Sequence, residues 1–122
     1  MQRLDRNHSA LWDMAEAIRE IQSFTETVTK EEYLETLWLK RVVERNFEIL
    51  GEAARNVSIE FQQAHPEIDW RNSIGVRNII AHRYKKVDHQ ILWTIVTTVL
   101  PQILAILEDL APPLPEDEMD EK

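Results

Sequence analysis

Hydrophobic residues recur three and four positions apart along most of the chain, and no stretch shows the strict alternation of apolar and polar residues that is typical of a β-strand. The first such segment covers residues 3–24 and ends before a run of alternating threonines. Its apolar positions, which share one face at helical spacing, are Leu4, Leu11, Met14, Ala15, Ile18 and Ile21. The pattern predicts a first long helix over these residues.

A second long helix is predicted from about residue 30 to residue 57. Thr29 and Glu32 have the spacing of a capping box, in which the threonine side chain accepts from the third backbone N–H and the glutamate reaches back to the cap. The apolar face of this helix contains Leu39, Val42, Val43, Phe47, Leu50, Ala53, Ala54 and Val57. Asn46 lies within that face, and we expect a buried amide that the backbone satisfies, with support for a buried polar site as the alternative.

Shorter elements are predicted between residues 58 and 83. Ser58 can cap a short helix that ends before Pro66, because a residue that precedes proline is disfavoured in the helical region. Residues 69–72 are predicted to form a turn or a single helical turn, and residues 76–83 a short helix.

The last long helix is predicted to begin at Asp88, whose side chain can cap it. Residues 90–107 contain no acid and no base, which is long enough to raise the possibility of a membrane span. The polar residues of this helix, however, fall on one stripe, and they are Gln90, Thr94, Thr97, Thr98, Pro101 and Gln102. We therefore expect an amphipathic helix of a cytoplasmic protein, with a kink at the proline within it.

These elements predict an all-α, up-and-down helical bundle of three long helices and one or two short ones. The length of 122 residues fits one domain, which we place at residues 1–111. Residues 112–122 are rich in proline and acidic residues and are predicted to form a disordered tail.

Composition excludes several classes of chemistry. The chain has no cysteine, so a disulfide scaffold, a thiol nucleophile and a cysteine-based zinc site are excluded. Its two glycines argue against a glycine-rich phosphate loop. Three of the four histidines, His8, His65 and His89, show no zinc-ligand spacing with an added acid. We predict neither a metal nor a cofactor.

The charge pattern points to one segment. The formal net charge is −8, yet the 18 residues between Asp69 and Asp88 contain no acid and five bases. These bases are Arg71, Arg77, Arg83, Lys85 and Lys86. An acid-free basic segment in such an acidic chain favours a bound polyanion, with chance clustering on a solvated loop as the alternative.

The same segment holds a possible catalytic set. Asn78 and His82 are four residues apart and would share a helix face, while the side chain of Arg77 can bend toward them and Tyr84 follows closely. Arginine offers a permanently charged fork for a phosphate, and histidine exchanges a proton near neutral pH. That pair suits attack of an RNA 2′-hydroxyl on the adjacent phosphate. The reaction needs an acid and a base, so a two-fold dimer that combines two histidines would complete the site.

The pattern Arg77-x4-His82-x-Tyr84 resembles the signature of the HEPN superfamily, specifically the HepT toxins of HepT–MntA toxin–antitoxin systems. Residues 45–54 are similar to the second long helix of that family, and residues 65–70 to its connecting segment. The resemblance covers roughly residues 3–110. The chain departs from the usual pattern at Asp69 and Val76, neither of which touches the chemistry.

The resemblance implies a HEPN fold that dimerises and acts as a metal-independent RNase. Arg77 and His82 would be the catalytic pair, with Asn78 as a polar neighbour. Tyr84 would be modified with AMP by a partner nucleotidyltransferase antitoxin like MntA, which adds bulk and negative charge where an RNA phosphate must bind.

The sequence thus predicts a toxin-type endoribonuclease, active as a homodimer on RNA and without a membrane association. The residues expected to bind RNA around the catalytic set are Arg71, Arg83, Lys85 and Lys86. The alternative is a non-catalytic binding subunit of a nucleotidyltransferase complex. The RNA target stays open, as does whether Asn46 and Glu52 support the site.

Overall fold

The computed structural model describes residues 2–71, 73 and 87–110, and all regular structure in these residues is helical. The elements are α1 (Gln2–Thr25), α2 (Lys30–Glu35), α3 (Leu37–Arg55), α4 (Ile59–Ala64), α6 (His89–Thr94), the π-helical turn η1 (Ile95–Val99) and α7 (Leu100–Leu110). The last three are continuous and form one helix of 22 residues. The part of the chain that the structure describes therefore contains three long helices and two short ones, which confirms the predicted all-α class.

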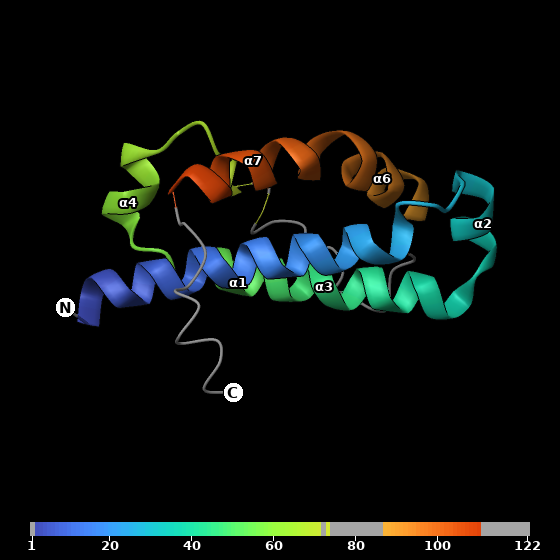
Figure 1. Cartoon of the computed structure of the whole chain (residues 1–122), viewed down its shortest axis with the longest axis horizontal. Helices are drawn as coiled ribbons and strands as arrows, with labels where there is room; N and C mark the ends of the chain where they lie inside the picture. The colour runs from blue at the N-terminus through green and yellow to red at the C-terminus, as the bar shows by residue number, and fades with distance from the viewer. Residues whose placement is uncertain (1, 72, 74–86, 111–122) are drawn as a thin grey trace.

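The three long helices lie side by side. Figure 1 shows α1 and α3 as an antiparallel pair, with the helix formed by α6, η1 and α7 packed along them. The short helix α2 lies at the same end of the bundle as α6, and α4 lies at the opposite end. The predicted tail, residues 112–122, is outside the described residues.

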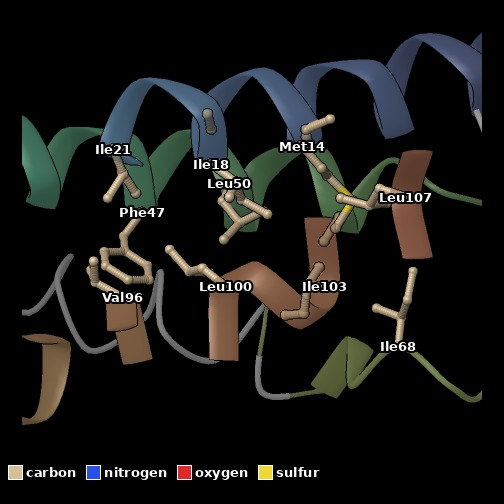
Figure 2. Packing of buried hydrophobic residues seen from close by; sticks show 14 of the residues in the cluster. Met14, Ile18, Ile21, Phe47, Leu50, Ile68, Val96, Leu100, Ile103 and Leu107 are labelled. Atoms are coloured by element: carbon tan, nitrogen blue, oxygen red, sulfur yellow. The ribbon is translucent and has the colours of Figure 1, made fainter. Parts of the chain in front are cut away.

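A single hydrophobic core fills the space between the long helices (Figure 2). Its members, all at most 7% exposed, include Met14, Ile18 and Ile21 of α1, Phe47 and Leu50 of α3, and Val96, Leu100, Ile103 and Leu107 of the last helix. Ile68, from the segment after α4, packs into the same cluster near Leu107. The apolar faces predicted for α1 and α3 are confirmed wherever side chains are described, and Val42 is the one residue of the α3 set that is only half-buried.

The predicted helix over residues 30–57 is wrong at one position, because Thr36 interrupts it. The capping box at its start is present, with Glu32 N donating to Thr29 Oγ1 at 3.1 Å and Thr29 N to Glu32 Oε1 at 2.9 Å. Thr36, however, adopts an extended backbone (φ −111°, ψ 102°). The break turns α2 across the end of the bundle, where Tyr33 is completely buried. Burial of this ring offsets the loss of helical continuity, a tertiary gain that local spacing does not reveal.

The start of α4 is tied to α1 by a pair of hydrogen bonds. Ser58 caps α4 as predicted, since its Oγ accepts from Phe61 N at 3.2 Å. Asn7 of α1 accepts from Ser58 N at 3.0 Å and donates to Ser58 Oγ at 3.2 Å. These bonds fix the chain as it leaves α3 and begins the segment that leads to the predicted site.

The helix from α6 to α7 accommodates Pro101 through a π-helical turn. Leu100 N donates to Ile95 O, five residues back, so the irregularity falls at η1, immediately before the proline. A wider turn fits here because proline has no N–H and its ring crowds the carbonyl four residues earlier, that of Thr97. The helix then continues to Leu110.

The polar stripe predicted for this helix is exposed along its whole length, as expected. By length and composition alone the helix could cross a membrane. In this fold its opposite side enters the core through Leu92, Val96, Leu100, Ile103 and Leu107. Arg19 of α1 also bridges it, with Nη2 3.1 Å from Glu108 Oε2.

Candidate functional site

The segment that carries the predicted catalytic set is only partly described. Arg71 is present, exposed and helical. The other predicted site residues, Arg77, Asn78, His82, Arg83, Tyr84, Lys85 and Lys86, lie outside the described residues. What the structure defines is how the chain is held on both sides of them.

On the N-terminal side, the anchor is Trp70. Its side chain is 7% exposed, its Nε1 donates to His65 O at 2.9 Å, and its ring lies edge-on to Phe61. Ser73 N donates to Asp69 O at 3.0 Å, so a helical turn begins here, as predicted. A buried indole therefore precedes Arg71 directly and fixes the position of the first base of the basic segment.

A groove of about 650 Å³ lies between α4 and this anchor. It is lined by Ile59, Gln62, Gln63, Pro66, Glu67, Ile68, Asp69, Trp70 and Arg71. The pKa of Glu67 is held below its usual range, first by its own backbone N–H and then by the His65 ring, whose Nδ1 is 3.3 Å from Glu67 Oε2. The groove therefore carries negative charge beside Arg71. The described part of the basic segment does not form a phosphate site by itself.

On the C-terminal side, Asp88 anchors the chain where the last helix begins. Its Oδ1 accepts from Gln90 N at 3.1 Å and from Ile91 N at 3.2 Å, which confirms the predicted cap. Such a cap satisfies backbone donors that would otherwise lack a helical partner.

His89, the next residue, lies in a partly buried chain of hydrogen bonds that joins α2, α3 and α6. Its Nδ1 is 2.7 Å from the Tyr33 hydroxyl, and its Nε2 is 2.9 Å from Glu44 Oε2. The same Glu44 oxygen is 3.1 Å from Arg41 Nη1. The ring of Tyr33 also stacks on Trp93, with centroids 5.1 Å apart. We call Tyr33, His89 and Glu44 the α2–α3–α6 triad.

Burial shifts the pKa values of two members of this triad, Tyr33 and His89. It raises the pKa of Tyr33 well above its usual value, and the nearby Glu44 charge adds to the rise. Burial also lowers the pKa of His89; Glu44 opposes this change, while Lys40 and Arg41 add to it. At neutral pH the tyrosine is therefore protonated and the histidine uncharged.

Sequence patterns did not single out His89 beyond placing it in the first helical turn. Its partners are 45 and 56 residues away in the chain, and only the break at Thr36 brings Tyr33 across to α6. The sequence signal that could have indicated this contact is Tyr33 itself, an aromatic residue inside a capped helix whose other residues are mostly charged.

Asn46 is a core amide, as expected. It is 3% exposed, and its Nδ2 donates to Val42 O at 3.1 Å. A carbonyl of its own helix therefore accepts one hydrogen of this amide. Among the described residues, no group of three or more histidine, cysteine or acidic side chains is arranged to hold a metal ion.

Comparison with known proteins identifies the family. Residues 14–110 match the family described as ribonuclease HepT-like. The chain is 36% identical over 108 residues to the "Probable ribonuclease HepT" of Thermococcus cleftensis, which covers 88% of this chain and 98% of the relative. It is 32% identical over 93 residues to "Putative RNase MJ1380" of Methanocaldococcus jannaschii, and this match covers 76% of this chain and 85% of the relative. No solved structure gives a significant match.

The chain therefore belongs to the HepT-like ribonuclease family. The matched region begins within α1 and ends with α7, so it contains the whole basic segment together with both of its anchors. The family resemblance predicted from the sequence is confirmed.

Proposed function

We propose that this protein is a toxin-type, metal-independent endoribonuclease in which Arg77 and His82 cleave RNA at the cleft of a homodimer. The observation that carries the proposal is the match of residues 14–110 to the HepT-like ribonuclease family, since that region includes Arg77-x4-His82-x-Tyr84. The acid-free basic segment supports it independently, because RNA is a polyanion.

In the proposed reaction, His82 of one subunit takes the proton of the RNA 2′-hydroxyl, whose oxygen then attacks the adjacent phosphorus. The bond from phosphorus to the 5′-oxygen breaks, and His82 of the partner subunit gives that oxygen a proton. The products are a 2′,3′-cyclic phosphate and a free 5′-hydroxyl. Arg77 stabilises the charge that develops on the phosphate, and Asn78 orients it. Arg71, Arg83, Lys85 and Lys86 hold the neighbouring phosphates.

The homodimer follows from this need for a second proton-transfer group. It is also supported by large apolar side chains on the described surface, where Leu37 and Trp38 at the start of α3 and Ile91 of α6 are each more than half exposed. Side chains of this size are common anchors of protein interfaces. The proposed location is the cytoplasm, where RNA substrates occur.

Purified protein is expected to cleave single-stranded RNA in the presence of EDTA, and to leave 2′,3′-cyclic phosphate ends. The reason is that the proposed chemistry uses a histidine pair and an arginine in place of a metal ion. Gel analysis of a labelled RNA, with product ends identified by mass spectrometry, makes the measurement. Cleavage that EDTA stops contradicts the metal-free mechanism. Absence of cleavage on every RNA tested favours a non-catalytic binding subunit of a nucleotidyltransferase complex.

Tyr84 is proposed as the control point, through transfer of AMP from a partner nucleotidyltransferase antitoxin. Co-production with such an enzyme is expected to increase the intact mass in AMP-sized steps, to place the modification on Tyr84, and to abolish cleavage. The added phosphate brings negative charge close to where an RNA phosphate binds. Tyr84→Phe is expected to show no AMP-sized increase in mass when it is co-produced with the same enzyme, and to remain active. Modification that maps to Tyr33, or modified protein that still cleaves RNA, contradicts this control.

A further inference from the structure

We propose that Tyr33, His89 and Glu44 form a proton-linked latch that fixes the start of the last long helix and so positions the segment that precedes it. This triad is not part of the proposed catalytic set. His89 is seven residues after His82 and five after Tyr84. Both ring nitrogens of His89 contact protein groups, Tyr33 and Glu44, so its proposed role is that of a positioning residue that acts through the helix it begins.

The partners determine which ring nitrogen of His89 carries the hydrogen. The Tyr33 side chain is completely buried, so its hydroxyl hydrogen needs an acceptor within the protein, and Nδ1 lies 2.7 Å away. The Glu44 carboxylate can only accept, and Nε2 lies 2.9 Å from it. A neutral ring with its hydrogen on Nε2 satisfies both contacts. The opposite tautomer would face a nitrogen lone pair toward the carboxylate.

Protonation of His89 breaks this arrangement at one point. The added hydrogen on Nδ1 would face the Tyr33 hydroxyl, which must then turn its own hydrogen away from its acceptor. Among the residues that the structure describes, the charged groups that act on the ring are Glu44, Lys40 and Arg41, all on α3, and two of the three oppose a positive ring. Tyr33 is the group that α2 places against it. The neutral state therefore closes the latch, and the protonated state loosens the contact between α2 and α6.

The consequence for stability follows from the direction of the pKa change. The folded state holds the pKa of His89 below its ordinary value of 6.5, so the unfolded chain binds the proton more readily. The latch contributes fully to stability above pH 6.5. Its contribution is lost as the pH falls from there through the lower pKa of the folded state.

Titration of the histidine side chains by NMR tests the latch directly, whatever the protein's activity. We expect His89 to be neutral with hydrogen on Nε2 at pH 7, and to titrate below 6.5. Tyr33→Phe keeps the ring that stacks on Trp93 and should raise the pKa of His89, because it removes the donor to Nδ1. Glu44→Gln should lower that pKa further. A matched control is Glu67→Gln, which changes the partner of His65 and should leave His89 unaffected.

Opposite shifts of the His89 pKa in the Tyr33→Phe and Glu44→Gln variants would support the latch. A hydrogen on Nδ1, or an ordinary pKa that Tyr33→Phe does not move, would overturn it. His89→Gln gives an independent check by urea unfolding. The free energy of unfolding of the wild type should decrease as the pH falls below 6.5, and this decrease should be smaller in the variant. An unchanged pH dependence of stability would also overturn the latch.

The positioning role rests on the proposed ribonuclease function, and the pH profile of cleavage tests it. If only the catalytic base is protonated, the cleavage rate on the acid side of the pH profile falls in first order with the proton concentration. Protonation of His89 would add a second proton to this dependence and make this acid limb steeper. His89→Gln should therefore make this limb shallower by up to one unit of slope. An unaltered limb would show that the latch does not act on the site. A wild-type protein that cleaves no RNA at any pH would instead overturn the proposed function, and the NMR test of the latch would still apply.

Discussion

Replacement of His82 by alanine is expected to lower the rate of RNA cleavage by about 10²–10⁴-fold, the usual contribution of a positioned general acid or base. The effect should fall on the chemical step, because in the proposed mechanism Arg77 and the other bases of the segment still hold the RNA. Single-turnover cleavage of a labelled RNA, with EDTA present, measures it. The matched control is His65→Ala, which removes a histidine with an exposed carboxylate partner and should leave the rate unchanged. Full activity of His82→Ala would remove this residue from the mechanism.

Mixed dimers make the same prediction sharper. If each active site needs His82 from both subunits, a dimer with one altered subunit is inactive. After subunit exchange between wild-type protein and His82→Ala, activity should fall as the square of the wild-type fraction. A linear decrease would show that each subunit carries a complete site. Sedimentation of each sample confirms that the variant still assembles, so loss of the dimer is separated from loss of the histidine.

Much of the fold could be predicted because the determining signals are local. The capping box at Thr29, the caps at Ser58 and Asp88, and the apolar stripes of the long helices are all encoded within a few residues. Each concerns hydrogen bonds or burial along a single helix, which spacing in the sequence reports directly. The structure confirms them for this reason.

Two features could not be predicted because they depend on partners that are distant in the sequence. The break at Thr36 follows no glycine or proline, and both halves around it remain helical. It becomes favourable only when Tyr33 is buried against the last helix. The position of η1 was missed for a related reason: proline predicts a disturbance nearby, but the packing of both sides of the helix decides which turn widens.

The candidate site was predictable in a different way. Charge counting found the basic segment, and its Arg77-x4-His82-x-Tyr84 pattern, preceded by residues 45–54 and 65–70 in order, indicated the family, which the match over residues 14–110 confirms. The roles of Arg77, His82 and Tyr84 remain predictions, because these residues lie outside the described part of the chain. The α2–α3–α6 triad was not predicted at all, since its three members come from separate helices.

Phe47→Ala is expected to destabilise the fold by about 3–5 kcal/mol, the usual cost of removing a buried aromatic ring. Phe47 is 1% exposed and lies in the core between α1 and the last helix, near Ile21 and Val96 (Figure 2). Its removal loses apolar contacts and leaves a cavity that helices held from both sides cannot easily close. Phe24→Ala is the matched control, because that ring is 41% exposed and packs edge-on against Trp38 at the surface.

Urea unfolding followed by circular dichroism measures both changes. The midpoint for Phe47→Ala should fall strongly at an unchanged slope, whereas Phe24→Ala should shift it little. Similar shifts for the two variants would contradict the single shared core. A typical domain has only about 5–15 kcal/mol of stability, so the Phe47 variant stands close to unfolding. Its RNA cleavage should therefore be lost at a lower temperature than that of the wild type, because Trp70 and Asp88, the anchors on the two sides of the basic segment, keep their places only while the long helices stay packed.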